Sequence, residues 1–408
     1  MLLKKSLCAM TLVPLLSYSA HAAPTQVSGF VTLGATYTDS DQLAFRSDVS
    51  IDDGKAEGID FGSLSRLGIQ LDKQFNEHWQ ATGQFVLKRH VDYSFDQLTQ
   101  LAFISYSPSP NWRVKIGRTG LDLFMMTPYR NIGYAYTETH APVEFYGLVP
   151  HQNIDGAELS TTHATANGTI TTRWYVGRSK DFLSNFEYEW ELVLDDIMGL
   201  TLAYEYDSWL FRLNHSRAEI GGEEIDHYAE LSQAVQRIPK AIWPQAISLV
   251  EDVTAVGSKI SYSTLGAKYD NGEYYTQSEI AYIDASTDVL NDLTNGYIHF
   301  GKRWDQYSAQ LGYSFTEGNE FETPAPVVSN PLLNQLFVAL DRGFNYYVND
   351  QSTVSLSGRY DFRPDMAMKL QFDYVNLKRD DNQFMLRLQS NADKEKLWVI
   401  SATLDWVF

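Results

Sequence analysis

The sequence predicts an all-β fold, an up-and-down antiparallel β-barrel of about 16 transmembrane strands, with short turns at one rim and long loops at the other. Three observations predict it. Apolar and polar residues alternate in many short stretches, aromatic residues stand at the ends of these stretches, and the connections between them alternate between short and long. A period of two gives a strand one apolar and one polar face.

Composition excludes several other classes of protein. The 408 residues include 32 basic and 51 acidic side chains, for a net charge of −19, which argues against nucleic acid as a partner. One cysteine cannot form a disulfide within the chain. With 13% aromatic residues the chain has too much apolar surface to remain disordered.

Residues 1–22 are predicted to be a signal peptide. Lys4 and Lys5 precede an apolar stretch, residues 7–16, and the stretch Ala20-His21-Ala22 has the A-x-A form of a cleavage site. About ten apolar residues are too few to span a bilayer as a helix. We therefore expect an exported mature chain, residues 23–408, which lacks Cys8 and with it any cysteine.

The C-terminal stretch shows the alternation most clearly. Trp398, Ile400, Leu404, Trp406 and Phe408 share one parity, and the intervening positions include Ser401, Thr403 and Asp405. A spanning strand needs only about 9–11 such residues, so a membrane protein does not require a long apolar run. The same pattern recurs along the chain, as in residues 79–88, 307–315 and 354–362.

Aromatic rings and charges distinguish the two predicted faces. Apolar sets begin or end with a ring at Trp79, Trp112, Trp209, Tyr307, Tyr313, Tyr374, Trp398 and Trp406, which suits the lipid–water interface. The polar parity carries Arg66, Lys88, Arg113, Lys115, Arg173, Arg212, Arg359 and Lys369. Charges in the middle of strands suit a wet interior.

The connections give the strand number. Short turns are predicted at residues 76–78, 107–111, 161–168, 207–208, 271–272, 303–306 and 363–365. Long stretches lie at about 38–62, 89–96, 119–152, 178–196, 216–256, 285–294, 316–350 and 379–395. Seven short turns and eight long stretches separate sixteen strands, and closure of the barrel leaves no unpaired edge in lipid.

The order of these features resembles the trimeric general-porin family of Gram-negative outer membranes. The resemblance covers the mature chain and rests on a glycine-containing first strand (residues 27–34), the stretch Ser65-Arg66-Leu67-Gly68-Ile69, the long third loop and the terminal Phe408. It implies periplasmic turns, external loops, a homotrimer in contact with outer-membrane lipid and lipopolysaccharide, and recognition of Phe408 by the barrel-assembly machinery. The family also implies that the third loop, residues 119–152, folds into the pore.

The predicted pore constriction joins acids of this loop to bases of the facing wall. The loop is rich in aromatic residues, so it is expected to pack rather than remain in water. The candidate residues are Arg66, Lys88, Arg113, Asp122, Glu138 and Glu144. The other interpretation is that the three acids only solvate the loop. Arg173, Arg212, Arg359 and Lys369 are further wall bases, but strand parity fixes their face and not their depth.

Two other loop features have competing interpretations. The acidic segment 48–54 of the first loop is predicted to be solvated or to bridge lipopolysaccharide, since it lacks the spacing of a calcium loop. Residues 229–236 and 332–338 are predicted to be helices, which either pack across the barrel rim or contact a partner.

These features predict an outer-membrane porin for passive diffusion of small hydrophilic solutes and ions. The alternatives are a channel specific for an anion, a sugar or a peptide, and a non-conducting barrel for adhesion or structure. No enzyme is expected, with no catalytic residues, metal site or cofactor, because the sequence has no G-x-S-x-G and no histidine pair with metal-ligand spacing. Ion selectivity stays open, because it follows the charges at the constriction rather than the net charge.

Overall fold

The computed structural model describes residues 24–51, 54–56, 58–184, 189–223, 226–245, 248–249, 255–287, 289–328, 330–378, 385–387 and 396–408. The signal peptide proposed for residues 1–22 lies outside them, as do Asp52 and Asp53 of the acidic segment. Among the described residues, no helix is both long and apolar enough to cross a membrane.

Sixteen strands of nine or more residues form the wall, and each pairs antiparallel with its neighbours. They are β1 (Gln26–Thr38), β4 (Arg66–Gln74), β5 (Trp79–Lys88), β6 (Thr99–Ser109), β7 (Trp112–Gly120), β8 (Asn153–Ala164), β9 (Thr169–Ser184), β10 (Glu189–Tyr206), β11 (Trp209–Gly221), β12 (Lys259–Asp270), β13 (Tyr274–Ala285), β14 (Leu293–Trp304), β15 (Tyr307–Gly318), β16 (Gln351–Arg363), β17 (Met366–Leu377) and β19 (Lys396–Val407).

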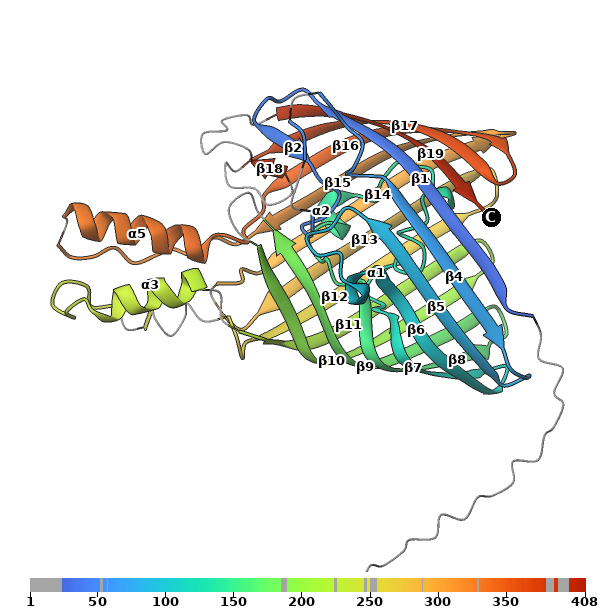
Figure 1. Cartoon of the computed structure of the whole chain (residues 1–408), viewed down its shortest axis with the longest axis horizontal. Helices are drawn as coiled ribbons and strands as arrows, with labels where there is room; N and C mark the ends of the chain where they lie inside the picture. The colour runs from blue at the N-terminus through green and yellow to red at the C-terminus, as the bar shows by residue number, and fades with distance from the viewer. Residues whose placement is uncertain are drawn as a thin grey trace, which may run out of the picture.

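The remaining elements are short or lie in the loops. They are β2 (Leu43–Phe45), β3 (Ile59–Asp60), β18 (Met385–Arg387), α1 (Phe95–Leu98), η1 (Gly133–Ala135), α2 (Val143–Tyr146), α3 (Asp226–Gln236) and α5 (Pro331–Phe344). β2 pairs with β18, so the first and last long loops meet. In Figure 1, α2 lies within the barrel outline, whereas α3 and α5 extend beyond it.

The first and last strands close the barrel. β1 pairs with β19 from Phe30–Val407 to Thr38–Val399 and with β4 on its other side. Beyond the ladder, the Gly29 N–H donates to the Phe408 carbonyl at 2.8 Å, and the Phe408 N–H donates to the Gly29 carbonyl at 3.0 Å. The predicted fold class, a closed antiparallel barrel of sixteen strands, is confirmed.

The two faces of the wall differ as the alternation predicts. On β19, Trp398 is 50% exposed and faces outward, whereas the neighbouring Val399 and Ser401 are buried on the inner side. Asp405 of the inner face is also buried, and it pairs with Lys369 of β17 (Oδ2–Nζ 3.1 Å). A charged pair inside and exposed aromatic residues outside are typical of a wall between water and lipid.

The short connections are tight turns at one rim. Gly272 has φ +90° in the turn between β12 and β13, a left-handed conformation that glycine adopts without strain. Asp207 and Asp305 take the corresponding left-handed position in two further turns, with φ of 52° and 49°. Aspartate tolerates this conformation better than most residues, because its short side chain hydrogen-bonds locally.

The fourth long stretch is shorter than predicted. We expected a loop at residues 178–196, but β9 continues to Ser184 and β10 begins at Glu189. The pairing of β9 with β10 shifts register between Leu194 and Ile197, and Asp196 has φ 49°. This β-bulge adds a residue to β10, so the polar residues Asp195 and Asp196 interrupt the alternation without ending the strand.

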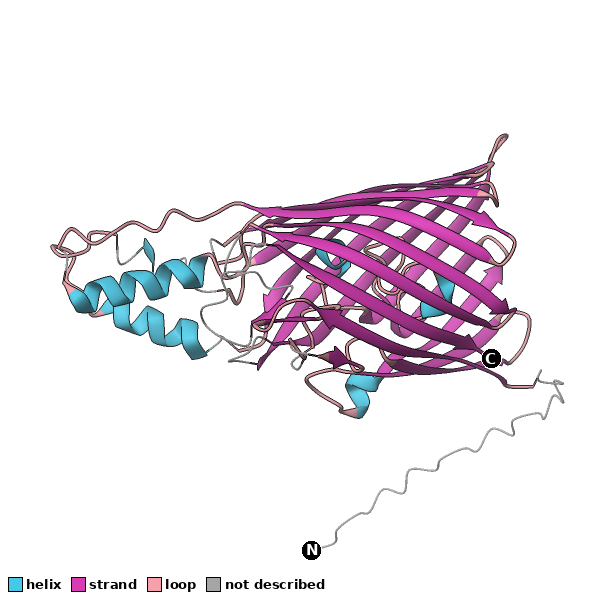
Figure 2. Ribbon diagram, turned by 90° about the horizontal axis from the view of Figure 1, so that it is seen from above, coloured by secondary structure: helices cyan, strands magenta, loops and turns pink. Residues whose placement is uncertain are grey.

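Helices α3 and α5 pack on each other at the long-loop end. Figures 1 and 2 show both projecting away from the barrel along its axis. They share a buried apolar cluster that includes Leu231, Trp243, Leu340 and Phe344. Both predicted helices are present, but the expectation that they pack across the rim was wrong, because their apolar faces are buried against each other.

Candidate pore constriction

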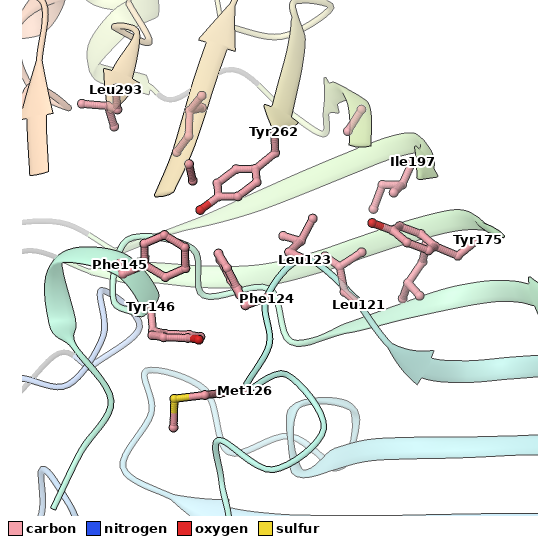
Figure 3. Close-up of a cluster of buried hydrophobic side chains, with 14 of the residues drawn as sticks. Leu121, Leu123, Phe124, Met126, Phe145, Tyr146, Tyr175, Ile197, Tyr262 and Leu293 are labelled. Carbon is pink, nitrogen blue, oxygen red and sulfur yellow. The ribbon is translucent and has the colours of Figure 1, made fainter. Parts of the chain in front are cut away.

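The segment between β7 and β8, residues 121–152, is called loop 3 below and packs against the inner face of the wall. Phe124 and Phe145 of the loop are almost completely buried. Phe124 contacts Tyr262 of β12 with ring centroids 5.4 Å apart, and Phe145 contacts Tyr297 of β14 at 5.0 Å. Figure 3 shows Phe124, Phe145 and Tyr146 gathered beside Tyr262. The aromatic side chains of loop 3 therefore attach the loop to the barrel wall.

A buried carboxylate on the wall holds loop 3 at two points, one near its start and one near its end. Glu279 of β13 accepts from the Met125 N–H at 3.0 Å and from the Tyr146 hydroxyl at 2.5 Å. The Tyr297 hydroxyl donates to the same carboxylate at 2.7 Å. Because several donors meet one acceptor group away from water, this network fixes the position of the loop.

Glu144 of α2 attaches loop 3 to strands β15 and β16 of the wall. Its carboxylate accepts from Ser314 Oγ at 2.6 Å and from Gln351 Nε2 at 2.5 Å, and it also accepts from the Thr353 hydroxyl. Glu144 is buried. In this arrangement its charge is satisfied by wall donors, so Glu144 is an anchor of the loop.

Asp122, at the start of loop 3, is a second buried anchor. It lies 3.2 Å from Nη1 of Arg173 and 3.2 Å from Nη2 of Arg212. Burial alone would raise the pKa of the Asp122 carboxyl, but the two guanidinium groups hold that pKa below its usual value. Asp122 therefore pairs with wall bases by direct contact rather than across an open passage.

Glu138 lines a polar cavity of about 390 Å³ on the turn side of loop 3, with Arg303 and Arg359 in the same lining. Its carboxylate accepts from Gln310 Nε2 at 3.0 Å and lies 3.6 Å from His299 Nδ1. Lys369 donates to the Glu138 carbonyl at 2.8 Å. Of the three predicted loop acids, Glu138 lines the largest cavity.

Arg66 and Lys88 lie side by side on the wall, next to loop 3 and to the first long loop of the chain. They face each other in the pairing of β4 with β5, at the long-loop end of these strands. Arg66 donates to the Arg130 carbonyl at 3.1 Å and to the Tyr136 hydroxyl at 2.5 Å, both in loop 3. A cavity of about 40 Å³, called the narrow space below, is lined by Arg66, Lys88 and Arg130 and by residues of loop 1 (residues 39–65).

Arg113 lies apart from Arg66 and Lys88. It is exposed near the start of β7, directly after a short turn, and its Nε donates to Ser107 Oγ at 3.3 Å. It lines a polar cavity of about 760 Å³ at the turn end of the barrel, together with Arg173. A mouth of this size is much wider than the space beside Arg66.

Three charged residues that line the narrow space were not predicted to do so: Asp48 of loop 1, Arg89 directly after β5 and Arg130 of loop 3. Asp48 Oδ2 lies 3.4 Å from Lys88 Nζ. Burial alone would raise the pKa of Asp48, but Lys88 and Arg130 outweigh it and hold that pKa well below its usual value. Asp48 therefore stays ionised and neutralises part of a basic cluster.

Loop 1 folds inward where we predicted an acidic, solvated segment. Residues 48–51 are buried, so that interpretation was wrong for them. The Val49 N–H donates to the Gly147 carbonyl of loop 3, and the Ser184 N–H donates to the Val49 carbonyl, both at 3.0 Å. The apolar residues Val49 and Ile51, which alternate with the polar ones, were the available signal.

Solved structures with a similar fold were found, although no family model and no curated protein matches the sequence. OmpF of Salmonella typhi, in a complex with daunomycin, is 14% identical with a TM-score of 0.56, over 94% of this chain and 97% of that chain. An anion-selective porin from Comamonas acidovorans is 13% identical with a TM-score of 0.53, over 94% and 99%.

A third similar structure is the outer membrane channel DcaP of Acinetobacter baumannii. It is 10% identical with a TM-score of 0.52, over 94% of this chain and 97% of that chain. Because these three proteins are only 10–14% identical to this chain, the similarity shows a shared fold. This chain therefore has the barrel fold of the outer-membrane porins.

Proposed function

We propose that this protein is an outer-membrane porin through which small hydrophilic solutes and ions diffuse passively. The observation that carries the proposal is a closed wall with a polar inner face, narrowed beside Arg66 and Lys88 by two inward-folded loops. A polar, charged narrowing admits hydrated solutes and disfavours apolar ones. We further propose cleavage after Ala22, assembly as a homotrimer in contact with lipopolysaccharide, and delivery by the barrel-assembly machinery through Phe408.

Planar-bilayer recording of the purified protein tests this function. A porin gives stepwise, ohmic conductance, and liposomes containing it swell in small sugars. Absence of both would contradict the proposal and favour the non-conducting barrel. Migration on unboiled gels tests the trimer separately, since a stable trimer runs at a higher mass than the heated chain.

A preference for anions is the second, finer proposal. Arg66, Lys88 and Arg130 line the narrow space, and Asp48 is the one acid in that lining among the described residues. A net positive charge in a confined passage attracts anions and repels cations. The similar fold of the Comamonas acidovorans porin described as anion-selective agrees with this preference. The reversal potential in a salt gradient measures it directly.

A further inference from the structure

The segment of loop 3 at residues 133–138 is attached to the wall through its backbone. Arg359 of β16 donates from Nη1 to the carbonyl oxygens of Tyr134, at 2.6 Å, and of Tyr136, at 2.9 Å. Its guanidinium lies over the Tyr134 ring, 4.5 Å from the ring centroid, and its Nε and Nη2 donate to Asp361. All three nitrogens of the guanidinium are engaged, so the Arg359 side chain is fixed in place.

Lys369 of β17 holds the two ends of the same segment. Its Nζ donates to the Gly133 carbonyl at 2.5 Å and to the Glu138 carbonyl at 2.8 Å, and it pairs with Asp405 at 3.1 Å. Arg359 and Lys369 are opposite each other in the pairing of β16 with β17. Two adjacent wall bases therefore satisfy four carbonyl groups of one short segment, which has no regular structure to satisfy them all.

Gly133 lies directly against the wall. A Cβ atom there would overlap the Asp405 carboxylate and lie 2.6 Å from Thr32 Oγ1. Thr32 Oγ1 donates to Asp405 Oδ1 at 2.6 Å, and both of these wall residues are buried. Because the wall is tightly packed at this point, only a residue without a side chain permits so close an approach of the loop.

Segment 133–138 lies at the edge of both polar spaces described above. Ala135, which is exposed, and Glu138 line the cavity of about 390 Å³. Arg66 donates to the Tyr136 hydroxyl at 2.5 Å from the side of the narrow space. The width that these spaces offer to a solute therefore depends on where the wall holds this segment.

We infer that Arg359 and Lys369 are positioning residues that limit the size of the solutes admitted by the proposed channel. They act by holding segment 133–138 at the wall, and neither of them needs to touch a solute. Because the bonds go to carbonyl groups, the attachment depends on the wall bases and not on the side chains of the segment. The inference rests on the proposed function for its solutes, but the position of the segment can be measured without conduction.

A spin label on the protein in detergent tests the attachment. Residues 23–408 contain no cysteine, so Ala135→Cys gives a single labelling site on an exposed residue of the segment. In this background, Arg359→Gln removes the guanidinium that reaches two carbonyl groups. We expect the rotational correlation time of the label to fall about twofold or more, because the segment is less restrained. An unchanged correlation time would overturn the inference.

Arg303→Gln is the matched control. Arg303 lines the same cavity as Arg359, and both are paired with Ser308 in the strand ladder. It also pairs with an aspartate, Asp270, at 2.7 Å and lies over a tyrosine ring, that of Tyr275, at 4.1 Å. Among the described residues it donates to no carbonyl of loop 3. The control therefore removes the same charge from the same cavity, and we expect wild-type mobility of the label.

The size limit is measured by the swelling of liposomes in sugars of different size. We expect Arg359→Gln to raise the rate for raffinose, a trisaccharide, relative to arabinose about 2- to 5-fold, and Arg303→Gln to leave this ratio unchanged. A more mobile label with an unchanged ratio would overturn the role in size selection. If liposomes with the wild type do not swell at all, the proposed function and the size limit both fail, whereas the label still supports or overturns the attachment itself.

A second variant keeps the inference testable if Arg359→Gln fails to fold. Gly133→Ala adds a methyl group that displaces the segment from the wall without changing any charge. Gly358→Ala is its control, because a Cβ atom at Gly358 meets nothing within 4 Å. We expect Gly133→Ala to change the label mobility and the sugar ratio in the same direction as Arg359→Gln, and Gly358→Ala to match the wild type. Wild-type values of both quantities in folded Gly133→Ala would overturn the inference as well.

Discussion

Asp48 and Lys88 form an ion pair between loop 1 and β5, with Oδ2 and Nζ 3.4 Å apart. The pair lies beside Arg66 and Arg130, so a single acid offsets several bases in a polar cavity of about 40 Å³. Charges at a confined position in a passage affect ions more than charges at a wide mouth, because less water screens them. The charge balance of this cluster is therefore the first feature to test.

Replacing Asp48 with asparagine should increase the preference for anions. The change removes the one offsetting acid and keeps the shape of the side chain. We expect the anion-to-cation permeability ratio, measured from the reversal potential in a KCl gradient, to rise about twofold. Asp41→Asn is the control, since Asp41 is exposed in the same loop and should leave the ratio unchanged. Equal effects of the two variants would place Asp48 outside the conduction path.

Replacing Arg66 with alanine should widen the passage and weaken its preference for anions. The guanidinium joins β4 to loop 3 through Arg130 and Tyr136, so its loss removes both a charge and a bulky group. We expect the conductance step to grow by roughly 10–50% and the anion preference to fall about twofold. In Arg113→Ala, the same change at the wide mouth, both quantities should stay near wild type. If Arg113→Ala has the larger effect, the narrowing lies at the turn end.

The fold could be predicted from the sequence because its signals are local and repeated. Most strands between Trp79 and Phe408 show the alternation in their own residues, and short turns carry residues suited to them, as Gly272 and Asp305 do. The prediction of a loop at residues 178–196 was wrong because a β-bulge changes the parity of β10. In a single sequence, the polar residues of such a bulge look the same as the polar residues of a loop.

The candidate site could be predicted only in part, because parity gives the face of a residue and not its depth. Arg66 follows a long loop and Lys88 precedes one, whereas Arg113 follows a short turn. That position indicates the depth of each base and separates Arg113 from the other two. The contacts of Asp48 and Arg130 depend on how two loops fold against each other, and no local pattern encodes such long-range packing.

Replacing Glu144 with alanine should destabilise the barrel by loosening loop 3. The carboxylate accepts from Ser314, Gln351 and Thr353, and its loss leaves these buried donors unpaired. We expect the free energy of unfolding to fall by about 1–3 kcal/mol, measured by denaturant titration of the heat-modifiable folded form. Glu77→Ala, at an exposed turn position, should change it by less than about 0.5 kcal/mol. A wild-type midpoint for Glu144→Ala would show that the anchor is dispensable.

Stability should depend on pH through His140 of loop 3, whose Nε2 lies 3.2 Å from Oδ2 of Asp373. Burial alone would lower the pKa of His140, but the hydrogen bond and charge of Asp373 outweigh it and raise that pKa above its usual value. A raised pKa stabilises the folded state fully below the unfolded value of about 6.5, and this stability is lost as pH rises through the folded pKa.

Comparison of wild type with His140→Gln isolates this contribution. His151 has the opposite sign, because burial lowers its pKa to about 4 and its stability is lost as pH falls from about 6.5 toward that value. His151 is present in both proteins, so its effect cancels. We expect His140→Gln to lose most stability relative to wild type below about pH 6.5 and progressively less as pH rises through the folded pKa of His140. His163→Gln, at an exposed position, should match wild type throughout. A constant difference between His140→Gln and wild type across that range would mean that the pKa of His140 is the same in the folded and the unfolded protein, which would contradict the raised folded pKa.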